Sequence, residues 1–155
     1  MLEVFIDGGC APKNPGGTAS WAFIVTMKHL DPVQPVGTTE VTEYLFEKCG
    51  VVGTGPGMSN NVGEYTALLE FLKWFDTQPT EEVVIKSDSQ LLINQMQGKF
   101  KVNKGTLCFP YYSKVQILRL QNSQVWKDKI KFEWIPREQN EADRLTKQAL
   151  REVGL

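Results

Sequence analysis

Residues 59–69 (SNNVGEYTALL) are the point at which the chain changes from a strand-like to a helix-like pattern. The stretch starts with Ser and Asn, which commonly begin helices. Apolar side chains then follow at the spacing of one helix face, as Tyr65, Leu68, Leu69, Leu72 and Phe75. The stretch therefore predicts a helix that packs on a core and follows an N-terminal part of a different kind.

The part before this helix has the pattern of three strands joined by turns. Residues 4–6, 21–25 and 44–52 are rich in residues that favour strands. Residues 12–17 are rich in Pro and Gly, and residues 28–40, with two prolines and a glycine, are expected to form a long turn. Short connections of this kind join antiparallel neighbours, so we expect an antiparallel set of three strands.

The part after this helix alternates between helices and strands. Pro79 is expected to end the first helix, and Gly98 the second. Pro110 suits the first turn of a third helix that includes Val115, Leu118 and Val125. The remaining elements are a strand over residues 83–85, a strand over residues 131–135 and a last helix from about Asn140. The order predicts an α/β fold, a mixed five-stranded sheet with three antiparallel strands and then two parallel ones, flanked by helices.

The composition is that of an ordinary globular protein. The chain has 155 residues, 41% hydrophobic and 23% charged, which suits a single domain over residues 1–155. No apolar run is long enough for a membrane span, and the N-terminus lacks the features of a signal peptide, so we expect a cytoplasmic protein. The net charge of −1 is unusual for a nucleic-acid-binding domain, although a local acidic cluster can lower it beside a basic groove.

The cysteines do not indicate a disulfide framework or a zinc site. There are three, Cys10, Cys49 and Cys108, and none belongs to a C-x-x-C pair. The single histidine, His29, has no partner in the pattern and is expected at the surface.

Four acidic residues occupy positions that suit a site at one edge of the sheet. Asp7 ends the first strand and Asp88 follows the fourth, whereas Glu64 and Asp143 are expected in the first turns of the first and last helices. Ligand sites in α/β sheets favour strand ends and the helix starts beside them. Carboxylates gathered there need a hard divalent cation to offset their repulsion, and Mg²⁺ is usual where phosphates react.

Each of these residues also has a purely structural interpretation. Asp7-Gly8 could be a turn, and Ser87-Asp88-Ser89 could merely cap a helix. Glu64 could complete a capping box with Asn61, and Asp143 could be a solvated acid in a first turn. The four residues together carry more weight than any one of them.

Four motifs, in order, resemble those of type 1 ribonucleases H. They are residues 4–9 (VFIDGG) with 14–17 (NPGG), residues 60–67 (NNVGEYTA), residues 87–91 (SDSQL) and residues 137–145 (REQNEADRL). The match covers nearly the whole chain and is closest to the compact members that lack a basic protrusion. It implies a ribonuclease H-like fold and hydrolysis of the RNA strand of an RNA–DNA hybrid, giving 3′-hydroxyl and 5′-phosphate ends. The sequence offers no clear oligomerisation surface, so a monomer is the default expectation.

The resemblance also implies roles for individual residues. Asp7, Glu64, Asp88 and Asp143 would bind two Mg²⁺ ions, which Mn²⁺ could replace, and would carry catalysis. Glu64 would also contact the 2′-hydroxyl beside the scissile phosphate, and Asp143 would help on the nucleophile side. The hybrid would be held by Asn14, Asn60, Asn61 and Gln90, and by backbone amides near Gly8, Gly9 and Cys10.

The sequence departs from the family at several places. Many bacterial members carry a histidine before the last helix, and this chain has none there; Arg137 is our candidate for its role, because its fixed donors suit a phosphate. The segment 99–104 (KFKVNK) could follow the DNA strand or be a solvated loop. A Leu-Ala pair of the family is Leu145-Thr146 here. Residues 26–44 have no role that the pattern assigns.

Two other functions compete with this one. A non-catalytic binding module could keep the same fold, but the loss of even one carboxylate would be expected then, and all four are present. A 3′–5′ exonuclease on the same fold would usually open with Asp-x-Glu, whereas this chain has Asp7-Gly8-Gly9.

Overall fold

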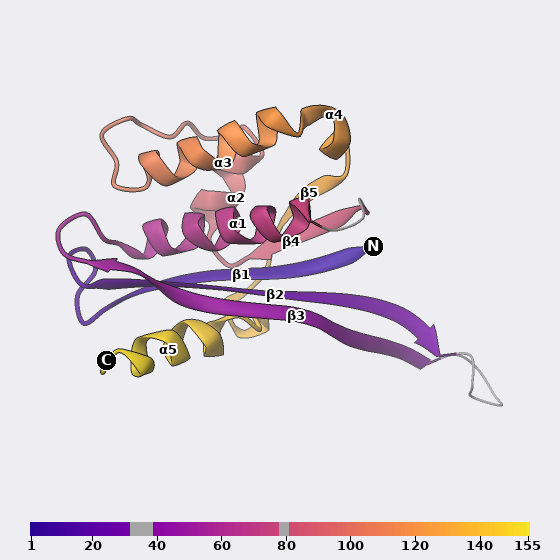
Figure 1. The fold of residues 1–155 in the computed structure, drawn as a ribbon, viewed down its shortest axis with the longest axis horizontal. Helices are drawn as coiled ribbons and strands as arrows, with labels where there is room; N and C mark the ends of the chain where they lie inside the picture. Colours follow the sequence, from indigo (N-terminus) through magenta and orange to yellow (C-terminus); the bar gives the residue numbers. More distant parts are fainter. Residues whose placement is uncertain (32–38, 78–80) are drawn as a thin grey trace.

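Five strands form one mixed sheet, as predicted. The structure is a computed structural model that describes residues 1–31, 39–77 and 81–155 (Figure 1). The strands lie in the order β3-β2-β1-β4-β5; the β1–β2 and β2–β3 pairs are antiparallel, and the β1–β4 and β4–β5 pairs are parallel. The strands are β1 (Leu2–Ala11), β2 (Thr18–Asp31), β3 (Thr39–Thr54), β4 (Val83–Ser87) and β5 (Ile130–Trp134).

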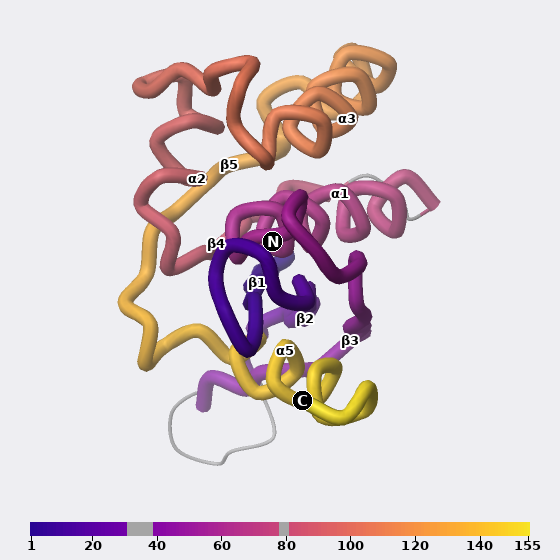
Figure 2. The backbone as a smooth tube through the Cα atoms, turned by 90° about the vertical axis from the view of Figure 1, so that its left-hand side faces the viewer, coloured from indigo at the N-terminus to yellow at the C-terminus, as the bar shows by residue number. Residues whose placement is uncertain are grey.

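The helices cover the sheet unequally. Among the described helices, α1 to α4 lie on one side of the sheet and α5 lies on the other (Figure 1). The view along the sheet in Figure 2 shows the same two layers. No helix in the described part of the chain is long and apolar enough to cross a bilayer. The helices are α1 (Asn60–Asp76), α2 (Gln90–Met96), α3 (Phe109–Gln121), α4 (Ser123–Trp126) and α5 (Asp143–Glu152), with a short 3-10 helix at Arg137–Gln139.

Apolar side chains of β2 point to both faces of the sheet, which explains why helices pack on both faces. Trp21, Phe23 and Val25 point into the larger core beneath α1, whereas Ala22 and Ile24 pack with residues of the α5 layer. Successive side chains of a strand point to opposite faces. A central strand that is apolar on both faces therefore requires helices on both sides of the sheet.

Serine side chains begin the two helices that border the site. Ser59 Oγ accepts a hydrogen bond from the backbone N–H of Val62 at 3.2 Å, and Ser89 Oγ accepts one from Leu92 at 3.1 Å. The predicted helix starts at these two places are confirmed. Because the serines do the capping, Asp88 and Glu64 are free for another role.

Several predicted boundaries are wrong. Residues 28–31 and 39–40 belong to β2 and β3 rather than to a turn, and residues 32–38, like Pro79, lie outside the described residues. This arm is mostly polar and exposed, with Lys28 near Glu3 and Glu40 and with Leu30 open to solvent, so it lacks the buried apolar alternation that marks a strand.

Two helix boundaries also differ from the predictions. Helix α5 begins at Asp143 and not near Asn140, whose side chain instead accepts a hydrogen bond from the backbone N–H of Ala142. Val125 belongs to the short α4 rather than to α3. The polar residues before α5 therefore form a separate turn that carries Arg137.

Candidate active site

The site lies where β1 and β4 stop pairing. Their parallel register runs from Leu2↔Val83 to Phe5↔Lys86, and two further residues at that register bring Asp7 opposite Asp88. Strand β1 then continues to Ala11 paired with β2 alone, so the prediction that Asp7 ends the first strand was wrong. An opening at the carboxyl ends of adjacent parallel strands is where ligands bind in α/β sheets.

Glu64 reaches the same opening from α1. A side-chain carbon on Gly8 would clash with the backbone at Gly63 and Glu64, and one on Gly63 would clash with the backbone oxygen of Ser20. The two glycines thus allow α1 to touch the backbone of the sheet, which brings Glu64 to the end of β1. Glu64 is the fifth residue of α1, so its predicted place in the first turn was wrong.

Three of the four predicted carboxylates form one compact group. Oxygen atoms of Asp7, Glu64 and Asp88 all lie within 4.8 Å of one another. Asp7 and Glu64 are each only 6% exposed, and Oε2 of Glu64 has no hydrogen-bond partner among the described residues. A buried carboxylate oxygen without a donor is costly unless it receives a cation. The group therefore offers closely spaced oxygen ligands and a buried oxygen without a hydrogen-bond donor among the described residues, and both features fit a divalent ion.

Burial and mutual repulsion raise the pKa values of these carboxyl groups. Burial is the main cause for Asp7, whose pKa rises to about 7, and the charges of Asp88 and Asp143 add to it. The pKa of Glu64 rises to about 8, first through burial and then through the charges of Asp7 and Asp88. The pKa of Asp88 is also raised by burial, although Asn140 and Arg137 oppose the rise. An ion that binds the group must therefore displace protons at neutral pH.

We expect the stability of the protein in a chelator to fall as the pH rises. The unfolded Asp7 and Glu64 ionise near their ordinary pKa values of 3.8 and 4.5, so the folded protein holds more protons between about pH 4 and pH 8. Their contribution to stability is fully present below the unfolded pKa values and is lost as the pH passes the folded ones. The melting temperature in EDTA should decrease from about pH 5.5 to about pH 8.5.

The control for this measurement is Glu64→Gln, which removes one of the two titrations and should flatten the decrease. Added Mg²⁺ should raise the melting temperature of the wild type more at the higher pH, where fewer protons compete. A wild-type melting temperature that is independent of pH in EDTA would contradict the account.

Asp143 lies beside this group rather than within it. It begins α5 and is half-buried. It forms an ion pair with Lys147, whose Nζ lies 2.9 Å from Oδ2 of Asp143. Its charge still contributes to the raised pKa of Asp7. The predicted position of Asp143 in a first helical turn is confirmed.

Two residues that the sequence analysis did not single out hold the site together. The buried Asn140 donates from Nδ2 to the backbone oxygen of Ile6 at 2.9 Å, which ties the turn before α5 to β1. The indole N–H of Trp134 donates to the backbone oxygen of Asp88 at 3.1 Å. Asn140 lies within the last motif and Trp134 just before it, but a sequence pattern cannot show a hydrogen bond across 134 residues.

A cavity of about 590 Å³ joins the carboxylates to most of the predicted substrate-binding residues. Gln90 is not among its lining residues and lies exposed at the start of α2. The side chains of Ser89, Thr146, Lys147 and Leu150 line it without having been predicted. The predicted residues that line it are Asp7, Gly8, Gly9, Cys10, Asn14, Asn60, Asn61, Glu64, Asp88, Arg137 and Asp143.

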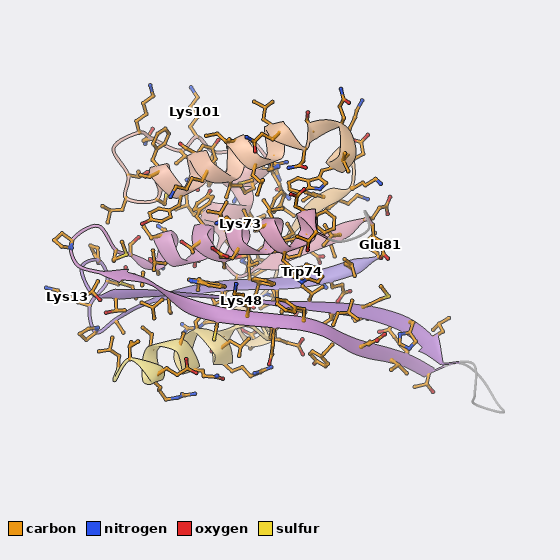
Figure 3. All side chains as sticks on the ribbon, in the orientation of Figure 1. Lys13, Lys48, Lys73, Trp74, Glu81 and Lys101 are labelled. Carbon is orange, nitrogen blue, oxygen red and sulfur yellow. The ribbon has the colours of Figure 1, made fainter. Side chains whose placement is uncertain are left out.

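The remaining polar candidates are placed as follows. Asn14 Oδ1 accepts a hydrogen bond from the backbone N–H of Asn60 at 3.0 Å. This bond joins the loop after β1 to the start of α1 beside the cavity. His29 is exposed on β2, as predicted. Lys101, in the connection between α2 and α3, points away from the body of the protein (Figure 3), so it is open to solvent or to a long ligand.

Comparison with known proteins gives the same fold along almost the whole chain. LC11-RNase H1, solved in complex with an RNA/DNA hybrid and isolated from compost by a metagenomic approach, is 29% identical with a TM-score of 0.73, covering 99% of both chains. The N-terminal RNase H domain of Rv2228c from Mycobacterium tuberculosis is 28% identical with a TM-score of 0.72, covering 97% of this chain and 94% of that one. RNase H1 from Halobacterium salinarum NRC-1, at 22% identity and a TM-score of 0.66, shares the fold.

Curated relatives are longer than this chain. The bifunctional protein Rv2228c of Mycobacterium tuberculosis is 30% identical over 145 residues, which are 93% of this chain and 34% of that protein. An uncharacterized protein of Mycobacterium bovis, Mb2253c, matches to the same extent. The chain therefore spans about a third of the length of these relatives.

The solved structures that share this fold at 27–29% identity are RNase H1 proteins or an RNase H domain, which confirms the resemblance found in the sequence. A family model described as reverse transcriptase-like matches residues 40–149. The chain belongs to that family.

Proposed function

We propose that the protein is a metal-dependent endonuclease that hydrolyses the RNA strand of an RNA–DNA hybrid. The observation that carries this proposal is the group of Asp7, Glu64 and Asp88, whose oxygens lie within 4.8 Å of one another and line an open cavity. The likeness to LC11-RNase H1, which was solved with an RNA/DNA hybrid, supports the choice of substrate.

Mg²⁺ is the ion that we propose for this group, with Mn²⁺ as a substitute. Asp7, Glu64 and Asp88 would hold it, and Asp143 would complete a place for a second ion. When bound, two such ions activate a water molecule and stabilise the leaving oxygen of an in-line displacement at phosphorus. The protein supplies carboxylates on rigid strands and helices, which keep their positions through the reaction.

The reaction would add water to the scissile phosphate and break its bond to the 3′-oxygen. That oxygen takes up a proton, so the products carry a 3′-hydroxyl and a 5′-phosphate. Asp143 is half-buried and faces the cavity, so it can orient the attacking water on the nucleophile side. Glu64 is more deeply buried, and its carboxylate would accept a hydrogen bond from the 2′-hydroxyl of the nucleotide beside the cut. The 2′-hydroxyl is the feature that distinguishes RNA from DNA.

The rim of the cavity offers donors for the two strands of the hybrid. Asn14, Asn60 and Asn61 carry amide groups there, and the backbone at Gly8, Gly9 and Cys10 borders the same space. Contacts of this kind to sugars and phosphates set the register of a nucleic acid without reading its sequence. We therefore propose little dependence on base sequence.

Arg137→Ala should weaken binding of the hybrid about five- to tenfold, as the loss of one charged phosphate contact would. Arg137 is exposed on the 3-10 helix and lines the cavity, and its charge lowers the pKa of Asp88. Fluorescence anisotropy of a labelled hybrid over a range of salt concentrations measures the affinity and its salt dependence. Arg151→Ala is the matched control, because Arg151 is also exposed but lies in the last turn of α5. Unchanged affinity and turnover in Arg137→Ala would remove this residue from the interface.

The proposed function is tested by the choice of substrate. The same labelled RNA is supplied annealed to DNA, annealed to RNA and single-stranded, and a labelled DNA strand is supplied in the hybrid. Internal cuts confined to RNA in the hybrid, with 3′-hydroxyl and 5′-phosphate ends, are expected. Tight binding of the hybrid without cutting of any strand would instead indicate a non-catalytic binding module.

A further inference from the structure

Thr146 brings a hydroxyl group from α5 to the carboxylates. Its side chain is 3% exposed and lines the same cavity. Its Oγ lies 3.4 Å from Oδ2 of Asp7 and 2.8 Å from the backbone oxygen of Asp143. One hydroxyl therefore contacts two of the four carboxylate-bearing residues, on elements that are far apart in the sequence.

A threonine in a helix often returns its hydroxyl to a backbone oxygen of the preceding turn. Thr66 does so in α1, where its Oγ lies 2.7 Å from the backbone oxygen of Val62, and it is also buried. Thr146 differs because its second neighbour is a carboxylate. This difference separates a role in the site from the ordinary habit of threonine.

The hydroxyl of Thr146 has one proton and can donate it to one acceptor at a time. Hydrogen bonds to an ionised acceptor are about twice as strong as those between neutral groups. The Asp7 carboxylate is thus the preferred acceptor when it acts as a ligand, and a small rotation of the hydroxyl reaches it. The backbone oxygen of Asp143 holds the hydroxyl nearby otherwise.

We infer that Thr146 is a positioning residue for the metal site. Its hydroxyl fixes the rotation of the Asp7 carboxylate relative to Glu64 and Asp88, and it ties that rotation to the start of α5, where Asp143 lies. This inference rests on the proposed function, since it assigns Thr146 to the same ion-binding group. Hydrogen bonds that orient ligating side chains commonly affect metal affinity by tenfold or more.

The test compares Thr146→Val, Thr146→Ala and Thr146→Ser with Thr66→Val. Valine keeps the shape and removes the hydroxyl, alanine removes it without adding a methyl group near Asp143, and serine restores it. Titration calorimetry with Mn²⁺ on the folded proteins should show about tenfold weaker affinity for the valine and alanine variants. The serine and Thr66 variants should stay near the wild type. With the hybrid, kcat should fall in the same two variants while KM is unchanged.

Wild-type affinity for Mn²⁺ in both folded variants without the hydroxyl would overturn the inference. An equal loss in Thr66→Val, or a loss in Thr146→Ser as large as that in Thr146→Val, would also overturn it, because the effect would then be one of helix structure. The proposed function fails separately, when the wild type binds Mn²⁺ but does not cut the hybrid. The calorimetric comparison still decides the role of Thr146 in that case.

Discussion

Asp88→Asn is expected to slow hydrolysis of the hybrid by about a thousandfold or more while the protein stays folded. Asparagine keeps the size of the side chain but removes a charge that would attract the ion and hold it close to Asp7 and Glu64. A bound ion contributes several kcal/mol to the transition state, and about 4 kcal/mol corresponds to about a thousandfold in rate.

The fold should tolerate this change for two reasons. The indole of Trp134 holds the backbone of residue 88 and not its side chain. The lost charge also removes a repulsion that raises the pKa values of Asp7 and Glu64. Melting temperature and single-turnover cleavage rate measure both halves of the prediction.

Asp76→Asn is the matched control for this comparison. Asp76 is an exposed aspartate at the far end of α1, about 18 Å along the helix from Glu64. The Asp76→Asn variant should cut the hybrid at the wild-type rate. Cleavage by Asp88→Asn at a rate near that of the control would mean that Asp88 is not a ligand of the ion.

Gly63→Ala is expected to destabilise the protein by about 3 kcal/mol or more, a large part of the stability of a small domain. The added carbon would clash with the backbone oxygen of Ser20 and crowd the backbone of Gly8 and Gly9. Backbone cannot move aside as a flexible side chain can, so α1 would have to shift from the sheet. The shift would also separate Glu64 from Asp7.

Urea unfolding measures this change, and Gly57→Ala provides the control. Nothing lies within 4 Å of a side-chain carbon at Gly57, which precedes the same helix. Gly57→Ala should therefore unfold near the wild-type midpoint. If Gly63→Ala also did so, the backbone contact of α1 with β1 and β2 would not be as close as described.

The sequence was sufficient to predict a mixed sheet of three antiparallel strands followed by two parallel ones. It was also sufficient to predict residues at the carboxyl edge of that sheet. Asp88 directly follows β4, as the local pattern predicted. Asp7 was predicted to end the first strand, but β1 runs to Ala11, and Asp7 lies where its pairing with β4 has ended. The continuous apolar run of residues 21–25 in β2 packs on both faces of the sheet, which agrees with the predicted sheet flanked by helices. These features depend on neighbours in the sequence, which is where patterns are informative.

What could not be predicted depends on contacts between distant residues. The polar arm of β2 and β3 has no apolar alternation, because neither face of its end packs on a core, so it was mistaken for a turn. Glu64 lies two residues deeper in α1 than a capping box with Asn61 would place it, because Ser59 is the cap. Asn140 and Thr146 act through hydrogen bonds to β1, and no local spacing reveals them.

The proposed ribonuclease H activity requires the carboxylate group of Asp7, Glu64 and Asp88 to bind a divalent ion. The measurement that tests it most directly is the initial rate of cleavage of end-labelled RNA in an RNA–DNA hybrid, with Mg²⁺ added stepwise to protein first treated with a chelator. We expect no cutting without the ion, and internal cutting that rises with Mg²⁺ to a plateau. Folded protein that binds Mg²⁺ or Mn²⁺ and leaves the hybrid intact at every concentration would contradict it.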